Sequence, residues 1–130
     1  MSISVSSVQE TGYRSLKVKG TYSLSNFQAL ADRIHAESLE HNCKNFLLDV
    51  SEVIGTVPVM HRFFLAEYVS KLWGTTIRVA IVYRAEDISK LFENAAVNRS
   101  VNTIVVPDVK TALKWLLGGA QSQPSVGDGK

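Results

Sequence analysis

The chain has 130 residues, of which 45% are hydrophobic and 20% charged, so it has room for one folded domain with one core. Its formal net charge is +2 and its basic residues are spread along the chain, so nucleic acid is not expected as a partner. The single cysteine, Cys43, excludes an intrachain disulfide, and no apolar run is long enough to span a membrane. These features predict a cytoplasmic protein without an integral membrane segment.

The chain is expected to open with a β-hairpin. Residues 3–8 and 13–19 alternate between apolar and polar, and the turn-forming residues 10–12 lie between these two runs. Three basic residues of the second run are expected on the solvent-facing side of a strand, namely Arg14, Lys17 and Lys19.

A long amphipathic helix is expected next. It begins at Ser23 or Ser25, and Ser25 with Gln28 fits a capping box in which side chains satisfy the first backbone donors. The apolar positions that fall close to one face of this helix are Leu24, Phe27, Leu30, Ile34 and Leu39.

The unbroken apolar run at 46–50 predicts a strand that is buried on both faces of a parallel sheet. After a loop at 51–57, Pro58 suits the first turn of a helix that ends at Gly74. Met60, Phe64, Tyr68 and Leu72 recur at helical spacing along it.

The second half of the chain predicts further strand and helix units. We expect strands at 77–83 and 103–106, a helix at 87–97, and a last helix that is capped by Asp108 and stops at Gly118. Residues 119–130 have almost nothing to bury and are expected to be a disordered tail, which leaves one domain at 1–118. The predicted fold class is α/β, with a mixed sheet opened by an N-terminal hairpin and covered by about four helices.

The sequence lacks the common catalytic motifs. There is no Gly-x-Ser-x-Gly turn, no phosphate-binding loop and no dinucleotide-binding glycine pattern, so we expect no enzyme, no cofactor and no metal. A catalytic site, if there is one, has to come from Asp49, His61 and Arg62, which lie around the end of the central strand.

The helix at 58–73 is apolar on more than one side. One face packs in the core, and the other face is expected to form a subunit contact, a partner surface or the wall of an apolar pocket. The residues that make it the candidate site are Met60, His61, Phe63, Phe64, Tyr68 and Trp73. Two cations, Arg84 and Arg99, are expected at the same edge of the sheet or at a neighbouring turn, where they could bind an anion or a carboxylate.

The order of the elements resembles that of the SpoIIAA-like family, which belongs with the STAS domains. The most specific parts of this resemblance are the turn at Asn98 and Arg99 and the ending Thr111-Ala112-Leu113-Lys114-Trp115-Leu116. The resemblance implies a regulatory domain that binds proteins, and it adds Asn98 and Arg99 to the candidate binding residues.

Two departures from the family pattern affect function. Related anti-sigma-factor antagonists carry a phosphorylatable serine at the start of the helix after the central strand, where this chain has Val57-Pro58-Val59-Met60. The nearest hydroxyls are those of Ser51 and Thr56. The family's usual glycine after Asn-Arg is Ser100 in this chain.

Two functions remain open on this basis. The leading hypothesis is a non-catalytic interaction or regulatory module that self-associates as a homodimer, uses the helix at 58–73 as its contact surface, and lacks the phosphoserine switch. The alternative, implied by the similarity of the family's fold to CRAL-TRIO lipid-transfer domains, is a carrier of a small apolar or lipid-like ligand.

Overall fold

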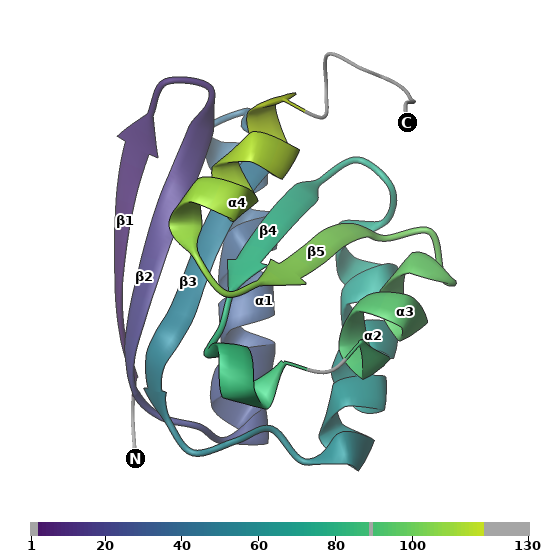
Figure 1. Cartoon of the computed structure of the whole chain (residues 1–130). Coiled ribbons are helices and arrows are strands. Elements are labelled where there is room, and N and C mark those ends of the chain that lie inside the picture. The colour runs from purple at the N-terminus through teal and green to yellow at the C-terminus, as the bar shows by residue number, and fades with distance from the viewer. Residues whose placement is uncertain (1–2, 89, 119–130) are drawn as a thin grey trace.

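The computed structural model describes residues 3–88 and 90–118 (Figure 1). Five strands alternate with helices along most of the chain. The strands are β1 (Ile3–Glu10), β2 (Tyr13–Thr21), β3 (Asn45–Ile54), β4 (Arg78–Val82) and β5 (Asn102–Val106). The helices are α1 (Leu24–Glu40), α2 (Val59–Trp73), α3 (Leu91–Val97) and α4 (Val109–Leu113), together with the 3-10 helix η1 (Ala85–Asp87) and the π-helix η2 (Lys114–Gly118).

The strands form one mixed sheet in the order β1-β2-β3-β4-β5. β1 and β2 pair as an antiparallel hairpin from Ile3 opposite Gly20 to Glu10 opposite Tyr13, and β2 to β5 are all parallel. The predicted fold class is therefore confirmed.

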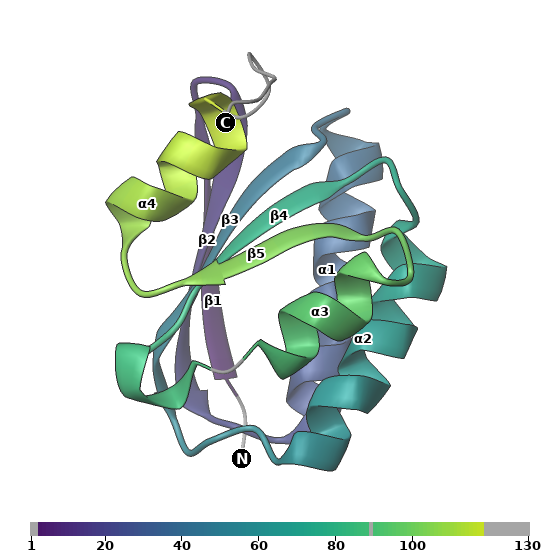
Figure 2. The same cartoon turned by 45° about the vertical axis from the view of Figure 1, so that its right-hand side comes forward.

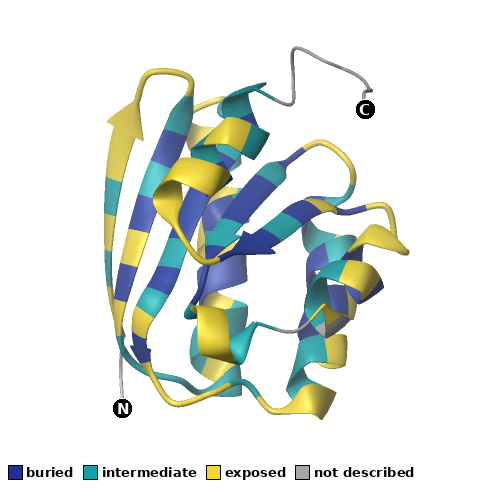
Figure 3. Cartoon of the chain, in the orientation of Figure 1, coloured by how far each residue is buried: buried dark blue, intermediate teal, exposed yellow. Residues whose placement is uncertain are grey.

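Helices cover the two faces of the sheet unequally. α1, α2 and α3 pack on one face, where β3 contributes Phe46 and Leu48 to the larger core. α4 and η2 cover part of the opposite face, where Leu47 of the same strand joins a smaller core with Ala112 and Leu116 (Figure 2). Because successive side chains of a strand point to opposite faces, β3 is buried on both sides, as its unbroken apolar run predicts (Figure 3).

The boundaries depart from the sequence predictions at a few points. The cap of α1 is Ser23, whose Oγ accepts from the amide of Asn26 at 3.1 Å, so the capping box at Ser25 is wrong. Leu39, expected on the packed face of α1, is 72% exposed. The helix expected at 87–97 is instead η1 and the shorter α3, with Ile88 extended after η1.

The C-terminal helix follows its prediction closely. Asp108 caps α4 by accepting from the amide of Thr111 at 2.7 Å. Residues 119–130, which we predict to be a disordered tail, lie outside the described residues.

Candidate functional site

The candidate site is built around α2, which is apolar on both of its faces. Gly74, with φ of 61°, is the C-cap residue, as the sequence predicts, and Pro58, expected in the first turn, is the N-cap residue directly before it. The inward face packs in the core through Leu65, Ala66, Val69 and Trp73.

The opposite side of the first two turns of α2 is an exposed apolar surface, which we call the outer α2 face. It consists of Val59, Met60, Phe63 and Phe64, which are 54%, 74%, 41% and 42% exposed. Residues three or four apart are neighbours on a helix, so these four side chains adjoin one another. Figure 3 shows the exposed first turn of α2 at the lower edge of the molecule. Contiguous exposed apolar surface of this kind is typical of interaction sites.

Tyr68 borders the outer α2 face and ties it to α1. Its ring stacks on that of Phe64, with centroids 6.2 Å apart and an interplanar angle of 19°. Its hydroxyl donates to Oδ1 of Asp32 at 2.7 Å, and this hydrogen bond raises the pKa of Tyr68. Tyr68 therefore fixes the position of Phe64 relative to α1.

Trp73 lies on the inward face of α2, away from the outer α2 face. It is 4% exposed, and its indole Nε1 donates to the carbonyl oxygen of Ala31 at 3.1 Å. Since Trp73 is buried, it contributes to binding only as a wall of an interior cavity.

His61 joins α2 to the end of β2. Its Nδ1 lies 2.9 Å from the hydroxyl of Tyr22, which follows the last residue of β2. Burial, with a smaller effect of Tyr83, raises the pKa of Tyr22, and the Tyr22 ring packs edge-on against Phe27 at 4.7 Å. Tyr22 was not among the predicted site residues, although its place directly after a parallel strand is a signal for such a role.

Arg84 holds the ends of two strands together. Its Nε donates to Oδ2 of Asp87 at 2.6 Å, and its other nitrogens donate to the carbonyl oxygens of Val53 and Gly55, the latter at 2.7 Å. The guanidinium also lies 4.9 Å from the ring centroid of Tyr83. These contacts fix η1 against the end of β3 and occupy most of the donors that we expected an anion to use.

Asn98 and Arg99 lie in the turn between α3 and β5. Because β4 and β5 are parallel, this turn is at the opposite edge of the sheet from Arg84, so the two arginines do not form one site. Nη1 of Arg99 donates to the carbonyl oxygen of Ala95 at 2.9 Å. Ser100 itself adopts the left-handed conformation, with φ of 69°, in place of the family's glycine.

The three residues named for a catalytic site are not brought together. Asp49 is paired in register with Lys17 of β2 and Val82 of β4, and its side chain is on the face of the sheet where α4 packs. His61 and Arg62 belong to α2, which packs on the other face. Oδ1 of Asp49 accepts from the amide and the hydroxyl of Ser51, at 3.0 and 2.6 Å, which is a structural contact.

An apolar cavity of about 100 Å³ lies between the sheet and the helices α1, α2 and α3. Its walls are side chains of β3, β4, β5 and all three helices, with further lining residues between these elements, and it is partly open to solvent. The cavity lining includes Leu30, Ala31, Leu48, Val50, Val69 and Trp73.

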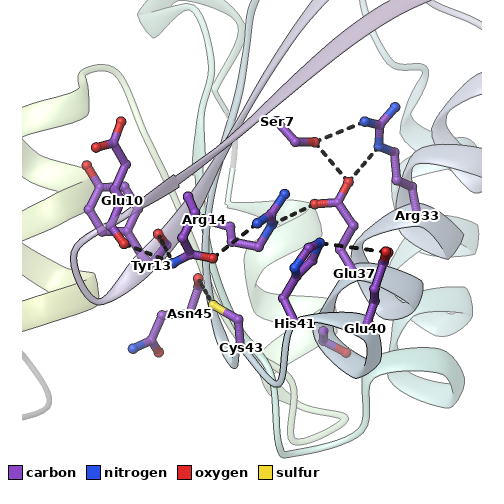
Figure 4. Close-up of polar contacts among 12 residues, drawn as sticks. Ser7, Glu10, Tyr13, Arg14, Arg33, Glu37, Glu40, His41, Cys43 and Asn45 are labelled. Carbon is purple, nitrogen blue, oxygen red and sulfur yellow. Dashed lines mark hydrogen bonds and ion pairs between the residues drawn. The ribbon is translucent and has the colours of Figure 1, made fainter.

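A polar cluster with Arg14 and Glu37 buried at its centre joins the hairpin to α1 (Figure 4). The carboxylate of Glu37 accepts hydrogen bonds from Ser7, Arg14 and Arg33, each at 2.8 Å. Arg14 was expected on the solvent-facing side of the strand, but this prediction is wrong. Its side chain points inward with Leu16 and is 8% exposed. Because successive side chains of a strand point to opposite faces, Arg14 lies on the face opposite to that of Lys17 and Lys19, and this could have been predicted from the sequence.

Burial of Glu37 opposes its ionisation, but the hydrogen bonds from Arg33, Ser7 and Arg14 outweigh this effect and lower its pKa. Within residues 3–88 and 90–118, no group of three or more His, Cys, Asp or Glu side chains is placed to hold a metal ion. No helix in this part of the chain is long and apolar enough to cross a membrane.

Comparison with known proteins identifies the fold. No family model and no curated protein sequence matches the chain. An anti-sigma factor antagonist from Mycobacterium paratuberculosis is similar in structure, with a TM-score of 0.58 and 19% identity over 88% of this chain and 94% of that one. An uncharacterised protein from Shewanella loihica PV-4 with a SpoIIAA-like fold gives a TM-score of 0.52 and 18% identity over the same shares of the two chains.

The chain therefore has a SpoIIAA-like fold. The resemblance inferred from the turn at Asn98 and Arg99 and from the ending at 111–116 is confirmed at the level of the fold.

Proposed function

We propose that the protein is a non-catalytic regulatory module that binds protein partners and self-associates as a homodimer through the outer α2 face. The observation that carries this proposal is the exposure of Val59, Met60, Phe63 and Phe64 in two consecutive turns of one helix. Leaving such a surface in water is unfavourable, and covering it in a complex removes that cost.

The geometry around the outer α2 face also supports a contact surface. Tyr68 and His61 anchor α2 to α1 and to the end of β2, so the exposed side chains stand on a fixed helix. A pre-organised surface loses less conformational entropy on binding than a mobile one.

The structural relatives favour a protein-binding role over catalysis. One of them is named as an antagonist of an anti-sigma factor, which is a function exerted on another protein. We propose that this chain works without a phosphoserine at the start of α2, because Val59, Met60 and His61 fill the first helical turn. The cytoplasmic location remains a prediction.

Light scattering over the micromolar concentration range tests the proposal. The wild-type mass is expected to rise from 14.3 kDa towards twice that value, and Phe64→Glu is expected to remain monomeric. Leu39→Glu is a matched control, because it places the same charge on an exposed apolar position of α1. A wild-type protein that stays at the monomer mass excludes self-association, and equal behaviour of the two variants excludes the outer α2 face.

A second candidate function, binding of a small apolar or lipid-like ligand, is favoured by the apolar cavity between the sheet and the helices. Native mass spectrometry of the purified protein and titration with a fluorescent fatty acid or a small aromatic probe test it. A co-purifying ligand or saturable uptake supports this function, and the absence of both opposes it.

A further inference from the structure

We propose that the cavity between the sheet and α1, α2 and α3 is a binding site for a compact, uncharged, apolar molecule of about the size of one aromatic ring. This inference rests on the second proposed function and goes further, because it names the class of ligand. It follows from the volume of the cavity, the chemistry of its walls and the pairing of the charged groups in its lining.

The walls of the cavity come from every layer around it. The sheet contributes Leu48, Val50, Ile81 and Val105, and the helices contribute apolar side chains from three directions. Most of the lining is well buried and hydrophobic. A cavity with such walls offers a water molecule too few hydrogen-bond partners, so it excludes water and favours an apolar occupant.

The volume limits the size of the occupant. Engineered cavities of about 150 Å³ with Leu, Ile and Phe walls stay dry and bind benzene or xenon. This cavity has about 100 Å³, which is room for a single small ring or a short branched alkyl group. A molecule of water takes about 30 Å³ and a methylene group is of similar size, so a long acyl chain does not fit inside.

The two charged residues of the lining, Asp87 and Arg62, already have partners within the protein. Asp87 is paired with Arg84 at 2.6 Å, and Nε of Arg62 donates to the carbonyl oxygen of Val57 at 2.8 Å. A charged ligand inside the cavity would lose its hydration without gaining a partner, which is strongly unfavourable. The site therefore selects uncharged molecules.

One wall of the cavity provides a specific optical signal. Trp73 lines the cavity, whereas the second of the two tryptophans, Trp115, packs under Arg78 on the other face of the sheet. In a Trp115→Phe variant, the emission of the remaining tryptophan reports on the cavity.

The test uses the full chain with benzene as the ligand probe and palmitate as the long-chain alternative. Benzene at about ten times its Kd is expected to raise the Tm of the wild type by about 4 °C and to change the Trp73 emission saturably. Palmitate is expected to do neither.

Two variants that fill the cavity and one control locate the site. Ala31→Leu extends a side chain of the lining into the cavity, and Val50→Ile is a smaller change for the case that Ala31→Leu does not fold. The benzene effect is expected to disappear in Ala31→Leu and to weaken at least several-fold in Val50→Ile. Ala36 is an exposed residue of α1, the helix that also carries Ala31, so Ala36→Leu is expected to retain the benzene effect.

The outcomes separate this inference from the function on which it rests. If palmitate raises the Tm and benzene does not, the size limit is wrong while the apolar-ligand function stands. If neither ligand has an effect, both the inference and that function fail. A benzene effect that persists in the filled variants places the ligand elsewhere and overturns the inference.

Discussion

The rings of Phe64 and Tyr68 stack on the outer side of α2, and the Tyr68 hydroxyl continues this contact to Asp32 of α1. One residue of the pair is thus part of the exposed surface, and the other fixes it to the body of the molecule.

The first prediction separates these two roles. Tyr68→Phe removes the hydroxyl that donates to Asp32 but keeps the stacked ring, so it is expected to leave the outer α2 face intact. Self-association by light scattering is expected to equal that of the wild type, with a small decrease in the urea midpoint of unfolding. Tyr68→Ala, which also removes the ring, is expected to weaken association, and equal association in the two variants would show that the ring does not support the surface.

The second prediction concerns the pH dependence of stability. The pKa of Glu37 is lower in the folded protein than in the unfolded chain, where it is about 4.3. Ionised Glu37 therefore stabilises the folded protein. This stabilisation is fully present when the pH is above the pKa of Glu37 in the unfolded chain, and it is lost as the pH falls through the pKa in the folded protein. Glu37→Gln is expected to cost about 3 kcal/mol at pH 7, because it leaves the buried Arg14 without a charged partner.

Urea unfolding between pH 7 and pH 3 measures this effect. The wild type is expected to lose more stability over this range than Glu37→Gln does. Parallel pH profiles of the two proteins would show that Glu37 is not the responsible group.

The third prediction concerns the clamp formed by Arg84. Arg84→Lys keeps the charge, but one ammonium group cannot hydrogen-bond to Asp87 and to the carbonyl oxygens of Val53 and Gly55 at the same time. The free energy of unfolding is therefore expected to fall by about 2 kcal/mol. Amide hydrogen exchange is expected to rise in η1 and at the end of β3 and to stay unchanged in β1. Exchange that rises equally throughout the sheet would contradict a local role for Arg84.

The fourth prediction concerns the left-handed residue before β5. Ser100 has φ of 69°, a conformation that glycine adopts without strain, so Ser100→Gly is expected to stabilise the protein by about 0.5 kcal/mol. Asn42, with φ of 50°, is the matched comparison, and its side chain tolerates this conformation better, so Asn42→Gly is expected to gain less. A larger gain at Asn42 in thermal unfolding would contradict this account.

Most of the fold could be predicted because its signals are local. The hairpin follows from the alternation of residues 3–8 and 13–19, and the caps at Asp108 and Gly74 follow from the residue types next to the helix ends. The break before α3 was not predicted, because the apolar spacing of residues 88–96 also fits one continuous helix.

The orientation of α2 could not be predicted in the same way. Phe64 and Trp73 are nine residues apart, so at about 100° per residue they point in opposite directions, yet both are large and aromatic. A helix that is apolar all round has no polar face to show which side is buried. The contacts between Tyr22 and His61, and between Arg14 and Glu37, join residues far apart in the sequence and depend on the assembled layers.

The most direct test of the outer α2 face is methionine-methyl NMR at increasing protein concentration. The chain contains two methionines, and the signal of Met60 is assigned by its loss in Met60→Leu. This signal is expected to shift as the dimer forms and to stop shifting in Phe64→Glu, whose association is expected to be weaker by at least about thirtyfold. A Met60 signal that stays constant while the mass doubles would place the contact elsewhere and contradict the proposed function of α2.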